Sequence, residues 1–181
     1  MKTLNQKLFS LLIIAAFTLG AVHAQTTTFD DWDKDDDGRI ERYEFTSVFV
    51  KEYFPAWDAD DDRGLIEEGF FRESYAGLDS DGDGFLSDEE WMIGFNYFYD
   101  DYVVYEDYDM VDVNEDGKIT YDEYYDVMYD TEYFTDIDMD ADNYISEYEL
   151  ADYVFENWDF NDSGTLSKSE FNRFDWYYLD V

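Results

Sequence analysis

The chain has 181 residues, and its 48 acidic residues outnumber its 11 basic residues so far that the net charge at pH 7 is −37. This charge disfavours nucleic acids and anionic membranes as partners, because both carry charge of the same sign. Such acidity is typical of disordered proteins, but aromatic residues make up 22% of the chain and supply apolar surface for a folded core. A chain that folds against its own charge repulsion is expected to bind cations.

Residues 1–24 have the pattern of a secretory signal peptide. Lys2 and Lys7 precede a mainly apolar run over residues 8–22, and the small residues Ala21 and Ala24 provide an A-x-A-like cleavage site. The alternative is a membrane anchor, but the run is shorter than the roughly 20 residues that span a bilayer. We therefore expect residues 1–24 to be removed and the protein to be secreted, to the periplasm or the extracellular space, without a membrane span.

The expected mature chain, residues 25–181, lacks both cysteine and histidine, because the only histidine is His23. This excludes zinc sites of the His/Cys kind, thiol catalysis and Ser-His-Asp triads. The signal peptide takes two basic residues and no acid with it, so 9 basic and 48 acidic residues leave a net charge of −39. Since disulfides are absent as well, bound metal is expected to hold the fold together.

Six acidic clusters recur along the chain, each followed by an aromatic-rich segment, and they begin at residues 33, 58, 79, 112, 138 and 159. The spacings of 25 and 21 residues between the first three return as 26 and 21 between the last three. We interpret this as a duplicated three-loop unit, with one half over residues 25–105 and the other over residues 106–181.

The segments between the clusters carry apolar residues at helical spacing, for example Phe45, Val48, Phe49 and Tyr53. Segments 70–78 and 150–158 are nine residues long and leave room for one helix between two clusters, whereas 91–111 has room for two. The sequence therefore predicts an all-α fold in which neighbouring loops share helices.

The first cluster shows the chemistry of a cation-binding loop. Over residues 33–44, aspartates alternate, Gly38 permits a sharp turn, and Glu44 returns a carboxylate to close the loop. Calcium takes six to eight oxygen ligands, and this arrangement lets twelve residues supply them. The loop resembles the EF-hand calcium-binding motif, and the pattern returns over residues 79–90, 112–123, 138–149 and 159–170.

The resemblance implies a set of calcium ligands in each of these five loops. The first, third and fifth residues give side-chain oxygens, the seventh gives its backbone carbonyl, and the twelfth is a bidentate glutamate. The implied ligands are Asp33, Asp35, Asp37, Arg39, Glu41 and Glu44; Asp79, Asp81, Asp83, Phe85 and Glu90; Asp112, Asn114, Asp116, Lys118 and Glu123; Asp138, Asp140, Asp142, Tyr144 and Glu149; and Asp159, Asn161, Ser163, Thr165 and Glu170. The eighth residue is apolar in all five, and in the EF-hand family it joins two loops through a short β-bridge.

Two loops depart from the pattern at the turn. In loop 138–149, Asn143 replaces the glycine, and since Asn tolerates positive φ we expect this site to persist. In loop 58–69, Arg63 occupies the turn and Gly69 replaces the closing glutamate, so we expect this degenerate copy to bind calcium weakly or not at all. Loop 159–170 offers two carboxylates and is expected to be the weakest of the five complete sites.

The loop spacing also predicts which loops pair. Loops 79–90 and 112–123 begin 33 residues apart, which is near the normal spacing of paired EF hands, so we expect them to pair. The duplication then pairs loop 33–44 with loop 159–170, and loop 58–69 with loop 138–149.

The sequence thus predicts a secreted binding or structural protein that is stabilised by about five calcium ions. One alternative is a calcium-dependent sensor or regulator that docks an unidentified protein partner, although residues 25–181 hold only four methionines for the Met-rich groove of such sensors. Another is an acidic protein that binds a mineral or other surface. Paired carboxylates can hydrolyse glycosides, but here the clustered acids are assigned to calcium, so we do not expect an enzyme.

Overall fold

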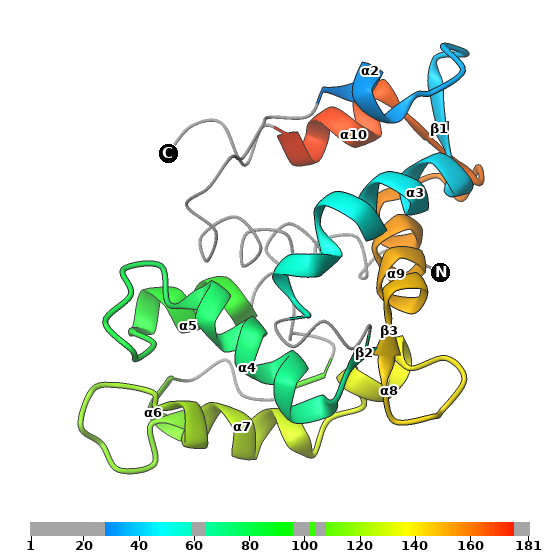
Figure 1. Cartoon of the computed structure of the whole chain (residues 1–181). Helices are drawn as coiled ribbons and strands as arrows, with labels where there is room; N and C mark the ends of the chain where they lie inside the picture. Colours follow the sequence, from blue (N-terminus) through cyan, green and yellow to red (C-terminus); the bar gives the residue numbers. More distant parts are fainter. Residues whose placement is uncertain (1–27, 59–63, 96–101, 104–107, 176–181) are drawn as a thin grey trace.

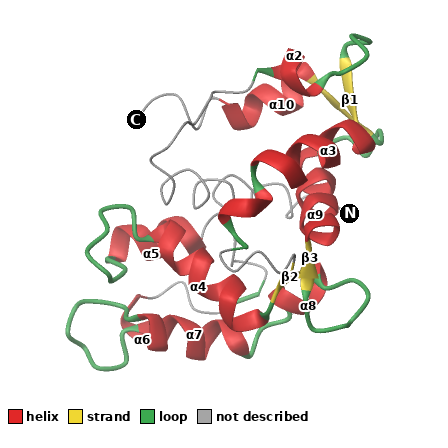
Figure 2. Ribbon diagram, in the orientation of Figure 1, coloured by secondary structure: helices red, strands yellow, loops and turns green. Residues whose placement is uncertain are grey.

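The computed structural model describes residues 28–58, 64–95, 102–103 and 108–175, and Figures 1 and 2 show how they are arranged. The expected signal peptide, residues 1–24, lies outside the described residues, as does much of segment 91–111, which had room for two helices. No helix in the described part of the chain is long and apolar enough to cross a membrane.

The described chain is mostly helical, with short strands beside the acidic loops. In chain order the elements are α2 (Phe29–Trp32), β1 (Arg39–Glu41), α3 (Arg42–Glu52), η2 (Phe54–Ala56), β2 (Gly64–Leu65), α4 (Glu67–Leu78), α5 (Asp88–Gly94), α6 (Tyr108–Val111), α7 (Tyr121–Tyr129), α8 (Tyr133–Ile137), β3 (Ile145–Ser146), α9 (Glu147–Trp158), β4 (Thr165–Ser167) and α10 (Lys168–Asp175). The expected all-α class is therefore corrected, because loop pairing extends into two small sheets.

These strands join loops that are far apart in the sequence. Strand β1 pairs antiparallel with β4, and β2 pairs antiparallel with β3. An isolated bridge joins the third pair of loops through two backbone hydrogen bonds of 2.9 Å. The facing apolar residues are Ile40 with Leu166, Leu65 with Ile145, and Leu86 with Ile119. The predicted pairing of the first loop with the sixth, the second with the fifth and the third with the fourth is confirmed.

Two helices are shared between neighbouring loops, as predicted. Helix α4 runs from loop 58–69 into loop 79–90, and α9 runs from loop 138–149 into loop 159–170. Helix α3 packs against α9, and α7 packs against α4 (Figure 1). The three pairings are symmetric when the first, second and third loops are exchanged with the fourth, fifth and sixth. The pair of loops one and six then becomes the pair of loops four and three, and the pair of loops two and five is unchanged.

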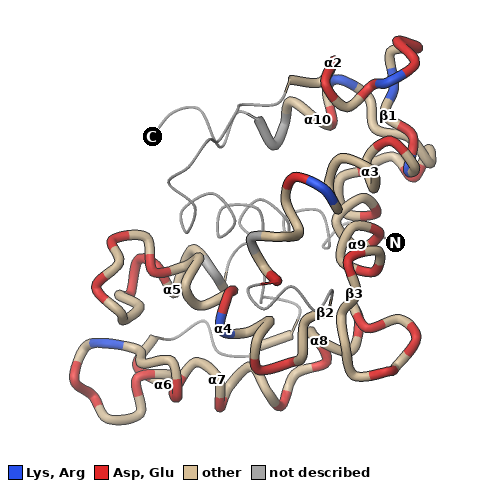
Figure 3. The backbone as a smooth tube through the Cα atoms, in the orientation of Figure 1, with Lys and Arg blue, Asp and Glu red and all other residues tan. Residues whose placement is uncertain are grey.

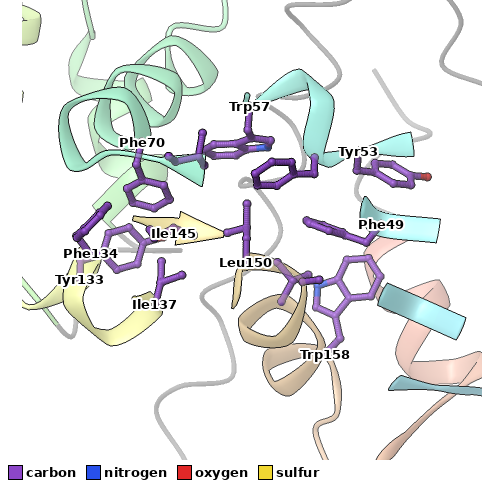
Figure 4. Packing of buried hydrophobic residues seen from close by; sticks show 14 of the residues in the cluster. Phe49, Tyr53, Trp57, Phe70, Tyr133, Phe134, Ile137, Ile145, Leu150 and Trp158 are labelled. Carbon is purple, nitrogen blue, oxygen red and sulfur yellow. The ribbon is translucent and has the colours of Figure 1, made fainter. Parts of the chain in front are cut away.

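Residues from 28–95 and residues from 108–175 share one aromatic core (Figure 4). The ring of Phe70 in α4 lies 5.5 Å from the ring of Tyr133 and 6.0 Å from that of Phe134, both in α8. Phe45 in α3 is fully buried and packs against Phe155 and the indole of Trp158 in α9, with ring centroids 5.5 and 5.4 Å apart. Since aromatic side chains bury large apolar areas, these contacts fix the helices that carry the loops.

Candidate metal centres

The acidic residues gather in the loops that connect the helices (Figure 3). In each of the five complete loops, the two oxygens of the first aspartate accept the backbone N–H groups of the fifth and sixth residues at 2.6–3.2 Å. These aspartates are Asp33, Asp79, Asp112, Asp138 and Asp159. The loop backbone therefore wraps around one carboxylate, which fixes the loop's shape.

The turn at the sixth residue requires a left-handed backbone, which favours glycine. Gly38 and Gly84 both have φ of +86°, and Asn143 takes the same place in its loop with φ of +70°. The expectation that Asn143 tolerates this turn is confirmed. The fourth residue of each complete loop also has positive φ, including Ala141 at +58°. Sequence reasoning missed this second turn, because Ala141 carries none of the usual preference for it.

The closing glutamate of each complete loop also starts the helix that follows. One of its oxygens accepts the backbone N–H of the ninth residue at 2.8–2.9 Å. The ninth and twelfth residues are thus the ends of a capping box, for example Ser87 and Glu90 at the start of α5. The carboxylate that is expected to close each site is therefore held in place by the first turn of a helix.

In three of these loops the hydrogen bonds also keep the closing carboxylate charged. Burial by itself raises the pKa of Glu90, but the hydrogen bonds from Ser87 and Ser80 outweigh it and lower the pKa below its usual value. The same balance lowers the pKa of Glu123 and Glu149, which accept hydrogen bonds from Thr120 and Ser146. A cation at these loops therefore meets ionised carboxylates at neutral pH.

Three loops bring carboxylate oxygens within 4.8 Å of one another. The groups are Asp33, Asp35 and Glu44; Asp79, Asp81 and Glu90; and Asp138, Asp140 and Glu149. Calcium holds its oxygen ligands at about 2.3–2.6 Å, so two ligands of one ion lie at most about 5 Å apart. The spacing and the all-oxygen donor sets of these groups fit calcium.

Loop 33–44 contains a second, overlapping group, made by Asp35, Asp37 and Glu41. The pKa of Glu41 is raised to about 7 by a hydrogen bond shared with Glu44, by burial and by the nearby negative charges. This crowding of acids is what a bound cation would relieve.

The remaining two loops replace carboxylates with neutral ligands. In loop 112–123 the amide oxygen of Asn114 accepts the N–H of Asp116 at 2.9 Å. In loop 159–170 the amide nitrogen of Asn161 donates to Glu170 at 2.7 Å. The hydroxyl of Ser163 donates to the carbonyl of Thr165 at 2.9 Å. The predicted ligands of loop 159–170 thus form hydrogen bonds with one another, and the rank of this loop as the weakest site stays a prediction.

The five seventh residues, which are expected to give backbone carbonyls, lie where the loops pair. Arg39 begins β1 and Thr165 begins β4. Phe85, Lys118 and Tyr144 each come directly before the residue that pairs with the partner loop. Pairing therefore holds the backbone of each predicted carbonyl ligand.

The degenerate loop 58–69 is described only in part, because residues 59–63 lie outside the described residues. Asp58 is buried but does not join, among the described residues, a group of three acids close enough to hold one ion. Of the two glutamates that could replace the closing residue, Glu68 forms a 2.8 Å ion pair with Arg72, and burial raises the pKa of Glu67. The expected weakness of this loop stays a prediction.

Two tyrosine hydroxyls lie within hydrogen-bonding distance of carbonyl oxygens at the bridge between loops 79–90 and 112–123, which sequence reasoning missed. The Tyr75 hydroxyl lies 2.9 Å from the carbonyl oxygen of Ile119 and 3.1 Å from that of Gly84. The Tyr108 hydroxyl donates to the carbonyl of Leu86 at 3.2 Å. Each tyrosine comes four residues before the first aspartate of its loop, where the other four loops have phenylalanine. The added hydroxyl was the signal in the sequence.

Comparison with known proteins adds a family to this geometry. The family model described as EF hand matches residues 78–95, 109–128 and 150–175. These segments contain loops 79–90, 112–123 and 159–170. No curated protein and no solved structure matches the chain.

Proposed function

Because the chain belongs to the EF-hand calcium-binding family, we propose that it binds calcium at five loops and that the bound ions stabilise its fold. The observation that carries this proposal is the convergence of carboxylate oxygens to within 4.8 Å in loops whose first aspartate and closing glutamate are held by backbone N–H groups. The proposed ligands are the side chains and carbonyls expected from the sequence, with loop 58–69 as a pairing partner that binds weakly or not at all.

The six loops are proposed to derive from a duplicated three-loop unit, with halves over residues 25–105 and 106–181. The support is the internal exchange symmetry of the three loop pairings, which is what duplication of a three-loop unit produces. In this scheme each half depends on the other, because every pair takes one loop from each half.

The protein is proposed to be secreted after removal of residues 1–24, with calcium in a structural role. Extracellular EF-hand modules bind calcium at about 10⁻⁴–10⁻³ M, so such sites stay filled where calcium is plentiful. Five calcium ions would change the mature net charge of −39 to −29. The binding free energy would then contribute directly to folding, because the acids repel one another without it.

A regulatory role would require a surface that calcium exposes to a partner. Met128 is fully buried, while Met110 in α6 and Met139 in loop 138–149 are exposed at separate places in the chain. The buried aromatic rings pack into one core cluster, which favours a fixed structure over an opening groove. We therefore place the binding or structural role ahead of a sensor, a mineral-binding protein or an enzyme.

The test is a calcium titration of metal-free residues 25–181 by calorimetry, with helicity followed by circular dichroism. Five saturable sites and a gain in helix and thermal stability are expected. Glu→Gln at each twelfth position should remove about one site, with the largest loss of affinity in loop 33–44. Glu132→Gln is the matched control, because it removes an exposed charge outside the loops and should leave the stoichiometry unchanged.

Weak, non-saturating uptake without a change in helicity would refute the proposal. Calcium-dependent binding of an apolar dye would instead favour the sensor, and calcium-dependent adsorption to a calcium mineral would favour the surface-binding protein.

A further inference from the structure

A lysine of one loop reaches the acidic ligands of its partner loop. Lys118 is the seventh residue of loop 112–123, directly before the bridge between Ile119 and Leu86. Its ammonium group lies 3.3 Å from Asp83 Oδ2 and 4.0 Å from the centre of the Phe85 ring. The bridge therefore directs this cation onto the fifth residue of loop 79–90.

Lys118 contacts one carboxylate oxygen of Asp83, and the loop backbone donates a hydrogen bond to the other. Asp83 Oδ1 accepts the N–H of Phe85 at 2.9 Å. The Oδ1 atoms of Asp37, Asp116 and Asp142 accept the matching N–H groups at 2.8–3.0 Å. Within the described part of the chain, no lysine or arginine forms an ion pair with these three aspartates. Among the described loops, loop 79–90 is the only one in which a lysine or arginine contacts the second carboxylate oxygen of the fifth residue, Asp83 Oδ2.

The seventh residues of the other two loop pairs make different arrangements. The side chain of Tyr144 packs against Gly64 of the partner loop, so closely that a Cβ added to Gly64 would lie 3.2 Å from the tyrosine ring. Arg39 faces a loop whose fifth residue is Ser163, which has no charge to offer it. In the pair formed by loops 79–90 and 112–123, a basic seventh residue of one loop therefore contacts the carboxylate of the fifth residue of the other. The other described pairs do not have this contact.

We propose that Lys118 sets the calcium affinity of loop 79–90, by holding the Asp83 oxygen that the ion needs. This inference rests on the proposed function of that loop. Calcium must displace the ammonium group to complete its coordination, so loop 79–90 binds more weakly than loop 138–149, although each offers four carboxylates. The ion pair also holds the two loops together before calcium arrives.

The size of the effect follows from the exposure of the pair. The side chains of Lys118 and Asp83 are 46% and 48% exposed, so solvent screens their attraction. Removing the lysine charge should therefore raise the calcium affinity of loop 79–90 by about two- to fivefold. The gain should shrink at high salt, because the Debye length falls to about 3 Å at 1 M.

The experiment is a calcium titration of ¹⁵N-labelled residues 25–181, followed by NMR at the amides of Gly84 and Gly117. Each amide donates to the first aspartate of its own loop, at 2.8 and 2.7 Å, so each reports on one loop. Lys118→Gln is compared with Lys51→Gln, which removes the same charge from an exposed ion pair with Glu52 outside the loops. Lys118→Arg keeps the charge and should keep the wild-type midpoint.

The expected result is a Gly84 midpoint about two- to fivefold lower in Lys118→Gln than in Lys51→Gln, with a smaller change at Gly117. Equal midpoints in the two variants, or an equal change at Gly84 and Gly117, would overturn the role of Lys118. If neither amide responds to millimolar calcium in the wild-type chain, the proposed calcium function of this pair fails instead.

Discussion

Removal of the Tyr75 hydroxyl tests whether the bridge between loops 79–90 and 112–123 depends on that contact. In Tyr75→Phe the ring keeps its place, because Tyr75 is only 7% exposed and Phe has the same shape. The carbonyl of Ile119 loses the hydroxyl at 2.9 Å but keeps the N–H of Leu86 at 2.9 Å, so it is not left without a donor. The loss is therefore that of one ordinary hydrogen bond, about 1 kcal/mol.

The assay is urea unfolding at saturating calcium, combined with amide hydrogen exchange at Leu86 and Ile119. We expect the free energy of unfolding to fall by about 1 kcal/mol and the two bridge amides to exchange about fivefold faster. Tyr129→Phe is the control, because Tyr129 is 54% exposed and contacts Tyr125 through its ring, which Phe keeps. If the two variants unfold at the same urea concentration, the hydroxyl contributes nothing to the bridge and the reasoning is wrong.

Three further predictions concern the core, the turn and the response to alkaline pH. Phe45→Ala should lower the free energy of unfolding by about 3–5 kcal/mol in urea, because it empties a fully buried aromatic site, whereas Ala at the 62% exposed Tyr148 should change it little. Asn143→Gly should raise the calcium affinity of loop 138–149 and Asn143→Ala should lower it, since φ is +70° there; calorimetry showing no difference between the two would contradict a strained turn. Burial raises the pKa of Tyr75 and Tyr153 above the usual 10.0, so the folded chain keeps these protons while the unfolded chain releases them, and stability should fall as pH rises above about 10. Urea midpoints that stay constant from pH 9 to about 11.5 would refute that assignment.

The loop chemistry could be predicted from the sequence because every part of it is local. A twelve-residue loop contains its own predicted ligands, its turn and its closing glutamate, so Asp33 and Glu44 could be predicted as ligands without knowledge of the fold. The pairing of loops could also be predicted, because the spacing of 33 residues and the duplication leave one consistent arrangement. Asn143 at φ of +70° shows that residue preference was sufficient even where the motif is broken.

Contacts between loops were decided by the tertiary structure alone. The sequence places Lys118 at a position that is expected to give its backbone carbonyl to calcium, and nothing in the sequence assigns a role to the side chain. Only the antiparallel bridge between Leu86 and Ile119 brings that ammonium group to Asp83, 35 residues earlier in the chain. The hydroxyl of Tyr75 reaches Ile119 for the same reason, across 44 residues. The sequence of each loop determines its predicted ligands, whereas the fold decides which charges and hydrogen bonds of the partner loop lie next to them.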